Sequence, residues 1–172
     1  LNLLTSGHGP VALLMGMDGT VRHEWRAEFE EVFPDHPKSE RAAELHRNFW
    51  RDALLFPNGD IVVIWELFGI FKLDRDSRVL WAVPEPAHHE LRLTELGEIA
   101  HLQAKRKMIR GIPQKKAVGD FIVVRDGGGN EQRRLALSDA LLNVDWLRLR
   151  RLFWARARER GYGLNEKNIF DP

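Results

Sequence analysis

The sequence predicts an all-β fold, because short apolar runs alternate with polar turns along most of the chain. Most of these turns carry Asp-Gly, Asn-Gly or a similar pair, which is typical of hairpins between antiparallel strands. A turn with glycine and a turn with aspartate also recur in the same order, so the strands group in fours. Repeated four-stranded antiparallel units are typical of β-propeller blades, which must stack on one another to cover their apolar faces. A single β-sandwich with irregular spacing is the alternative fold.

The first hairpin covers residues 11–26, with an Asp-Gly pair at Asp18 between two apolar runs. Such a pair predicts a type I′ turn, in which both central residues have a positive φ. Asp18 lies seven residues before Trp25, and Asp74 lies seven residues before Trp81, so the two aspartate turns align. Residues 11–26 therefore represent the last two strands of a unit. The apolar segment before them also has the pattern of a strand.

Two complete units follow this hairpin. The first covers residues 52–83 and contains the turn Asn58-Gly59, and the second covers residues 89–137 and contains the turn Leu96-Gly97. The chain thus holds about two to two and a half four-stranded antiparallel blades, a number that leaves two sheet faces open. The sequence therefore predicts a fragment of a β-propeller.

Three segments interrupt the repeat. Residues 39–48 have the apolar spacing of a helix, residues 104–118 are basic and have the pattern of a long loop, and a helical stripe covers about 138–160. The whole chain, residues 1–172, is then expected to be part of one propeller domain with helical insertions. Its first and last residues fall inside this pattern, which indicates a piece of a longer protein.

The composition narrows the classes of function. The 26 basic and 25 acidic residues leave a net charge of +1, so no overall field favours a nucleic acid as partner. The chain has no cysteine, which excludes disulfides and thiolate metal sites, and we assign none of its residues as a metal ligand. It contains no run of about 18 apolar residues, the length that a membrane-spanning helix needs.

His88 and His89 are the strongest candidates for a ligand site. They follow a proline-containing link and come just before the first strand of a unit. In a propeller this strand lines the central channel, so an imidazole at its start could donate a hydrogen bond to an anion or bind a metal. The alternative is that one histidine packs against a neighbouring loop while the other faces solvent.

Other histidines and the tryptophans have structural interpretations. His23 and His101 alternate along strands and are predicted to be half-exposed. Three tryptophans close strands and are predicted to pack between neighbouring units: Trp25, Trp65 and Trp81.

Several of these segments together resemble the bacterial arylsulfotransferase family. They are residues 51–60, 72–74, Trp81 and 87–90, preceded by residues 17–19 and 23–25. The most specific feature is their order: a blade that ends in tryptophan, a short proline-rich link, two histidines and an acid, a strand, and a glycine turn. The resemblance extends over nearly the whole chain, from residue 3 to residue 172.

This resemblance implies a six-bladed propeller that moves a sulfuryl group from an aryl sulfate to a phenol through a histidine, without a cofactor. It implies that His88 and His89 bind the sulfuryl group, as an early channel histidine of that family does. The nucleophilic histidine would lie beyond Pro172, so the resemblance implies no catalytic residue within this chain. It also implies that the remaining blades of the propeller pack against this segment, and it is compatible with a homo-oligomer. The family is typically exported or membrane-anchored, so the resemblance implies a periplasmic, exported or membrane-anchored protein.

Two other functions are compatible with the predicted fold. Propellers serve many functions, so the main alternative is a non-catalytic propeller that binds a ligand or a protein. A quinone-dependent dehydrogenase propeller ranks last, because the sequence contains no acidic cluster of the kind that binds calcium.

Overall fold

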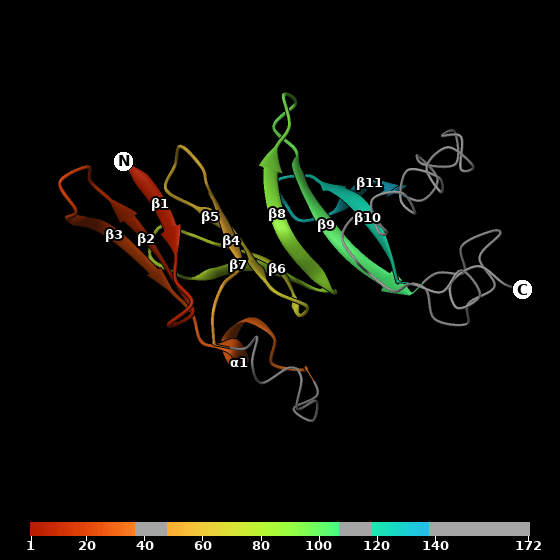
Figure 1. Ribbon diagram of the computed structural model, residues 1–172, viewed down its shortest axis with the longest axis horizontal. Helices are drawn as coiled ribbons and strands as arrows, with labels where there is room; N and C mark the ends of the chain where they lie inside the picture. Colours follow the sequence, from red (N-terminus) through yellow and green to blue (C-terminus); the bar gives the residue numbers. More distant parts are fainter. Residues whose placement is uncertain (37–47, 107–117, 138–172) are drawn as a thin grey trace, which may run out of the picture.

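The strands form three antiparallel sheets that lie side by side in chain order (Figure 1). A computed structural model describes residues 1–36, 48–106 and 118–137. The predicted all-β class is confirmed in this part of the chain. The first sheet contains β1 (Asn2–Thr5), β2 (Val11–Met15) and β3 (Val21–Arg26). The second contains β4 (Asp52–Leu55), β5 (Ile61–Trp65), β6 (Gly69–Leu73) and β7 (Val79–Pro84), and the third contains β8 (Ala87–Leu93), β9 (Ile99–Arg106), β10 (Val118–Arg125) and β11 (Glu131–Ala136).

The connections between strands differ from the predicted insertions at several points. A single helical turn, α1 (Phe29–Val32), links the first two sheets and buries Phe29 and Val32. The predicted loop over 104–118 is too long at both ends, because β9 continues to Arg106 and β10 begins at Val118. The helix predicted over 39–48, apart from its last residue, and the helix predicted over 138–160 lie outside the described residues. Within the described ranges, no helix has the length and apolar character needed to cross a bilayer.

Five hairpin turns share one geometry, which differs from the predicted type I′ turn. In the first turn the N–H of Gly19 donates to the carbonyl of Gly16 (3.0 Å), and the N–H of Gly16 donates to the carbonyl of Thr20 (2.8 Å). Gly19 has a φ of 79°, but Asp18 does not have the positive φ that a type I′ turn requires. The turn is therefore type I, followed by one left-handed residue. The same pair of hydrogen bonds closes the turns at 56–60, 74–78, 94–98 and 126–130.

The turns also correct the predicted alignment of the aspartates. Gly16 holds the position in the first turn that Asp74 holds in the later one, so the residue equivalent to Trp81 is His23 and not Trp25. A shift of two residues keeps a side chain on the same face of a strand. Both indoles accordingly reach the next sheet: Trp25 donates to the carbonyl of Gly59 (3.2 Å) and Trp81 to that of Gly127 (3.1 Å).

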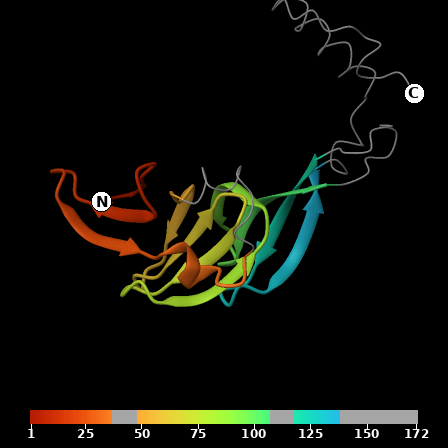
Figure 2. The same cartoon turned by 90° about the horizontal axis from the view of Figure 1, so that it is seen from below.

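Apolar packing joins the three sheets into one row, which Figure 2 shows from below. The first interface contains Trp25, Trp65 and Phe71, and the second contains Ile64 and Leu91. All five residues of β5 are buried, because this strand lies between the two neighbouring sheets. The first strands of the sheets also lie side by side, with β4 in contact with both β1 and β8. The predicted packing of the tryptophans between units is thus observed for Trp25 and Trp65, and Trp81 packs against the second interface.

The left-handed position of these turns can be tested without any change in packing. Gly97 has a φ of 77°, and a Cβ atom added there would meet no atom within 4 Å. We therefore expect Gly97→Ala to lower the free energy of unfolding by about 1 to 2 kcal/mol, from backbone strain alone. Gly127→Ala is the control, because Gly127 has equally open space and no positive φ. Urea denaturation curves that shift equally for both variants would contradict this explanation.

Candidate functional site

His88 and His89 lie inside β8, and not before it as predicted. Ala87 pairs with Gln103 and His88 with Leu102, but the next pair on β9, His101, is with Leu91. His89 and Glu90 therefore form a bulge in the strand. His89 has a φ of 59°, which is uncommon for a residue other than glycine. Bulges of this kind turn side chains away from the regular alternation and are frequent near active sites.

The second sheet holds the bulge in place. Asp52, in β4, accepts a hydrogen bond from the N–H of Leu91 through Oδ2 (2.8 Å). Its other oxygen, Oδ1, accepts from the N–H of Ala53 (2.9 Å), which fixes the carboxylate. The strand β8 is thus tied to its neighbour β4 at Leu91, two residues after His89.

The side chain of His88 lies on the face of the third sheet that is turned away from the second. Ala87 and Leu91 pack against the second sheet, and side chains alternate along a strand, so His88 projects to the other side. There its Nε2 atom is 3.3 Å from Oδ1 of Asp120 in β10. The side chain of His88 is 13% exposed and that of Asp120 is 49% exposed. This pairing across β9 was not predicted from the sequence.

The two imidazole rings contact each other directly. Nδ1 of His88 lies 2.7 Å from Nδ1 of His89, and the rings are nearly perpendicular. A hydrogen bond between two ring nitrogens requires a proton on one and a lone pair on the other. The pair therefore shares one proton at this contact. His89 is an exposed residue.

A second group of polar side chains is buried between the second and third sheets. Glu85, in the link between β7 and β8, lies 2.7 Å from Nη2 of Arg125 and 3.1 Å from Nε2 of His101. Nε of Arg125 lies 3.2 Å from Nε2 of His101, and Nη1 of Arg125 donates to the carbonyl of Gly129 (2.8 Å). His101 is 2% exposed, so the prediction that it is half-exposed was wrong. Sequence reasoning missed Glu85 and Arg125 altogether.

Glu85 stays ionised in this cluster. Burial by itself raises the pKa of the Glu85 carboxyl group, but the hydrogen bonds and charges of His101 and Arg125 outweigh it and hold the pKa below its usual value. The amide of Gln103 also donates to the carboxylate. The group is thus a buried ion pair in which Oε2 of Glu85 accepts from both Arg125 and Gln103, and its position between two sheets indicates a structural role.

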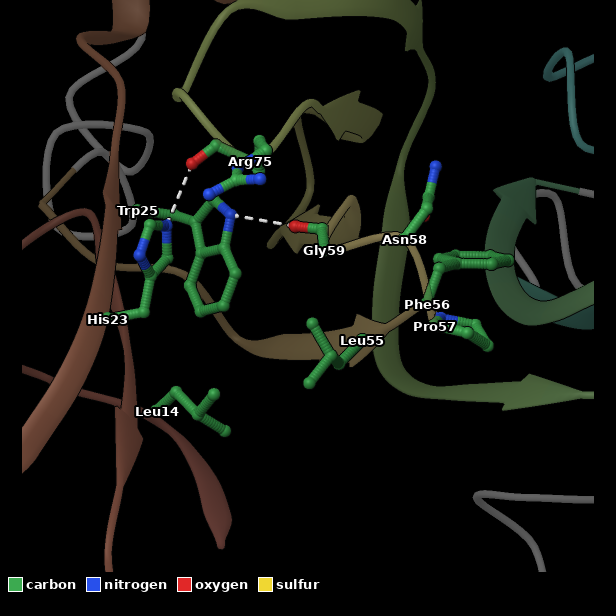
Figure 3. A pocket seen from close by; sticks show the side chains of 9 residues that line it. All are labelled: Leu14, His23, Trp25, Leu55, Phe56, Pro57, Asn58, Gly59 and Arg75. Atoms are coloured by element: carbon green, nitrogen blue, oxygen red, sulfur yellow. Dashed lines mark hydrogen bonds between the residues drawn. The ribbon is translucent and has the colours of Figure 1, made fainter.

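An apolar pocket lies between the first and second sheets (Figure 3). Its volume is about 370 Å³. Nε2 of His23 donates a hydrogen bond to the carbonyl oxygen of Arg75 (2.7 Å), and the His23 ring packs edge-on against Trp25. Figure 3 shows these two rings on one side of the pocket and Leu55 on the other. The pocket is lined by Leu14, His23, Trp25, Leu55, Phe56, Pro57, Asn58, Gly59 and Arg75.

Neither a metal centre nor a known relative supplies a function. In the described part of the chain, no three side chains of histidine, aspartate or glutamate are placed to hold a metal ion together. No protein-family model matches the chain, and no curated protein matches it. The features that bear on function are therefore the two histidines, the residues that hold them, and the arrangement of the sheets.

Proposed function

We propose that the three sheets are consecutive blades of a β-propeller. The support is their repeated packing: each sheet covers a face of the next, and β4 contacts both β1 of the first sheet and β8 of the third. The two outer faces carry apolar side chains that a further blade would cover, such as Leu4, 47% exposed, and Leu135, 50% exposed. Three sheets cannot close a ring, so further blades are part of this proposal.

We propose that the complete propeller transfers a sulfuryl group from an aryl sulfate to a phenol, and that His88 and His89 form part of its substrate site. The observation that carries this proposal is the bonded pair of imidazoles at a bulge in the first strand of a blade, with His89 exposed. A protonated imidazole there can donate a hydrogen bond to an anionic oxygen. Transfer of a sulfuryl group resembles phosphoryl transfer, in which positioning and charge stabilisation supply most of the catalysis.

We also propose where the nucleophile comes from, that the reaction needs no cofactor, and where the protein is located. The nucleophilic histidine would come from another blade, since His88 and His89 are assigned to binding. No nucleotide or metal cofactor is needed for transfer between two aryl oxygens through a histidine. A periplasmic, exported or membrane-anchored location follows from the arylsulfotransferase resemblance and is proposed on that basis.

The test is turnover of 4-nitrophenyl sulfate by the full-length protein, with phenol as acceptor and nitrophenolate absorbance as readout. We expect His89→Ala to lower kcat/KM by about a hundredfold, the usual loss when one donor to a transition-state oxygen is removed. His8→Ala is the control, because His8 is an exposed loop residue that bonds only locally, to Ser6. Equal rates for the wild-type protein and the variant that carries both His88→Ala and His89→Ala would exclude the pair from the site.

A non-catalytic propeller that binds a ligand is the second candidate. The pocket beside Trp25 favours it, because its volume and apolar walls are those of small-molecule sites. Calorimetry with 4-nitrophenyl sulfate separates the two functions. Binding without turnover, unchanged by His89→Ala, would favour the second candidate.

A further inference from the structure

The two histidines of the candidate site are joined to a carboxylate that no sequence pattern connects to them. Asp120 lies in β10, 32 residues after His88, yet its Oδ1 atom is 3.3 Å from Nε2 of His88. That nitrogen is buried, so a proton on it has no access to water. Nε2 of His88 and Oδ1 of Asp120 are at the distance of an ion pair without the alignment of a hydrogen bond, and rotation of the Asp120 side chain would supply that alignment.

This carboxylate decides where the protons of the two neutral rings lie. A carboxylate only accepts, so it favours the form of His88 that carries its proton on Nε2. Nδ1 of His88 then has a lone pair, and the short contact with Nδ1 of His89 requires the proton to be on His89. A neutral His89 that is protonated on Nδ1 has its lone pair on Nε2. The exposed His89 therefore presents a proton acceptor to a ligand.

We propose that Asp120 is a positioning residue, which acts through His88 to keep the Nε2 atom of His89 free to exchange a proton with the phenolic oxygen. This inference rests on the proposed sulfuryl transfer and adds a role for the pair beyond binding. The protons between Asp120 and His88 and between His88 and His89 stay in the same positions whether or not Nε2 of His89 is protonated. Only the outermost nitrogen changes state.

The proton balance over one cycle is complete. In the first half, the bond between sulfur and the aryl oxygen breaks as the nucleophile binds sulfur, and Nε2–H of His89 gives its proton to the departing aryl oxygen. The product is a neutral phenol, and His89 is left neutral. In the second half, Nε2 takes the proton of the acceptor phenol as that oxygen bonds to sulfur and the nucleophile leaves. His89 is then protonated again, and no other reactant is consumed.

The bulge gives this arrangement its geometry. A regular strand would place His88 and His89 on opposite faces of the sheet, where their rings could not meet. The positive φ of His89 and the bond from Leu91 to Asp52 bring the rings together instead. The backbone conformation that is unusual for histidine is thus the one that the proton chain needs.

The test measures the tautomers directly, by ¹⁵N NMR of the histidine rings in the full-length protein. In the wild-type protein we expect neutral His88 to carry its proton on Nε2 and neutral His89 to carry it on Nδ1. Asp120→Ala is expected to make both rings a mixture of tautomers and to lower kcat roughly tenfold with little change in KM, a fraction of what acid–base catalysis supplies. Asp76→Ala is the control, because Asp76 is an exposed acid in the turn between β6 and β7, away from the third sheet.

The outcomes separate this inference from the proposed function. A proton on Nε2 of neutral His89 in the wild-type protein would overturn it, and so would ring signals that do not respond to Asp120→Ala while turnover is normal. If the tautomers are as expected but no aryl sulfate is turned over, the role in exchanging a proton with a phenol is overturned together with the proposed function. The tautomer arrangement itself would then stand as shown by the NMR signals.

Discussion

Replacing Glu85 by glutamine is expected to lower the free energy of unfolding by about 3 kcal/mol or more, although the two side chains have the same size. The carboxylate of Glu85 is 7% exposed and is the charged partner of Arg125, which is 5% exposed. Without it, the guanidinium of Arg125 stays buried and has lost the carboxylate that pairs with it. Breaking a buried pair in this way costs far more than the intact pair contributes, because the remaining charge has lost its water. Urea denaturation at pH 7 measures the difference.

Glu131→Gln is the matched control for this variant. Glu131 also pairs with an arginine, Arg134, at 2.7 Å, but the two side chains are 35% and 29% exposed. A pair so accessible to water contributes about 0 to 1 kcal/mol. Equal losses for the two glutamine variants would contradict the role assigned to burial. Adding Arg125→Met to Glu85→Gln should recover much of the free energy of unfolding, because it removes the unpaired buried charge.

The same carboxylate gives a dependence on pH with a definite sign. His101 and Arg125 hold the pKa of Glu85 below its usual value against the opposing effect of burial. A lowered pKa in the folded state means that the stabilisation is fully present above the unfolded pKa, about 4.3. It is lost as the pH falls through the lower folded pKa. The difference between wild type and Glu85→Gln should therefore be constant near neutral pH and shrink below about pH 4.

The strands could be predicted from the sequence because their information is local. Alternation of apolar residues and a glycine after each polar turn place the hairpins, and the four strands of 52–83 correspond closely to β4–β7. The turn type could not be predicted from the Asp-Gly pair, because the same pair suits a type I′ turn and a type I turn with a left-handed residue after it. The choice is made by the backbone hydrogen bonds from Gly16 and Gly19, which involve residues outside the pair.

The candidate site was predictable only in part for a similar reason. His88 and His89 stand out as neighbours in the sequence, but Asp120, which contacts His88, and Asp52, which holds the backbone of Leu91, come from other strands. Glu85 lies between two prolines and has the local pattern of an exposed link. Its burial follows from the chain's crossing between two sheets, which brings it against His101 and Arg125. Contacts between residues so far apart in the sequence produce no periodic pattern, so a single sequence cannot reveal them.

Gly129→Ala is the second substitution expected to have a large effect, because two independent penalties meet at one residue. Gly129 has a φ of 86°, so any side chain there has the strain of the left-handed region, about 1 to 2 kcal/mol. Its added Cβ atom would also lie 2.8 Å from Cδ2 and 2.9 Å from Cε3 of Trp81. The indole cannot retreat freely, since its N–H donates to the carbonyl of Gly127. Overpacking of this kind adds about 1 to 3 kcal/mol.

A double-mutant cycle separates the two penalties. In a Trp81→Ala background the ring is absent, so Gly129→Ala should cost only the backbone strain, the same loss expected for Gly97→Ala in the open turn at 94–98. The coupling energy between the two sites should then be about 1 to 3 kcal/mol, the part that comes from the indole. Urea denaturation of the four proteins of the cycle gives this number. If Gly129→Ala costs the same with and without the indole, then Trp81 does not pack against this turn, and the third sheet is not held to the second in the way the structure shows.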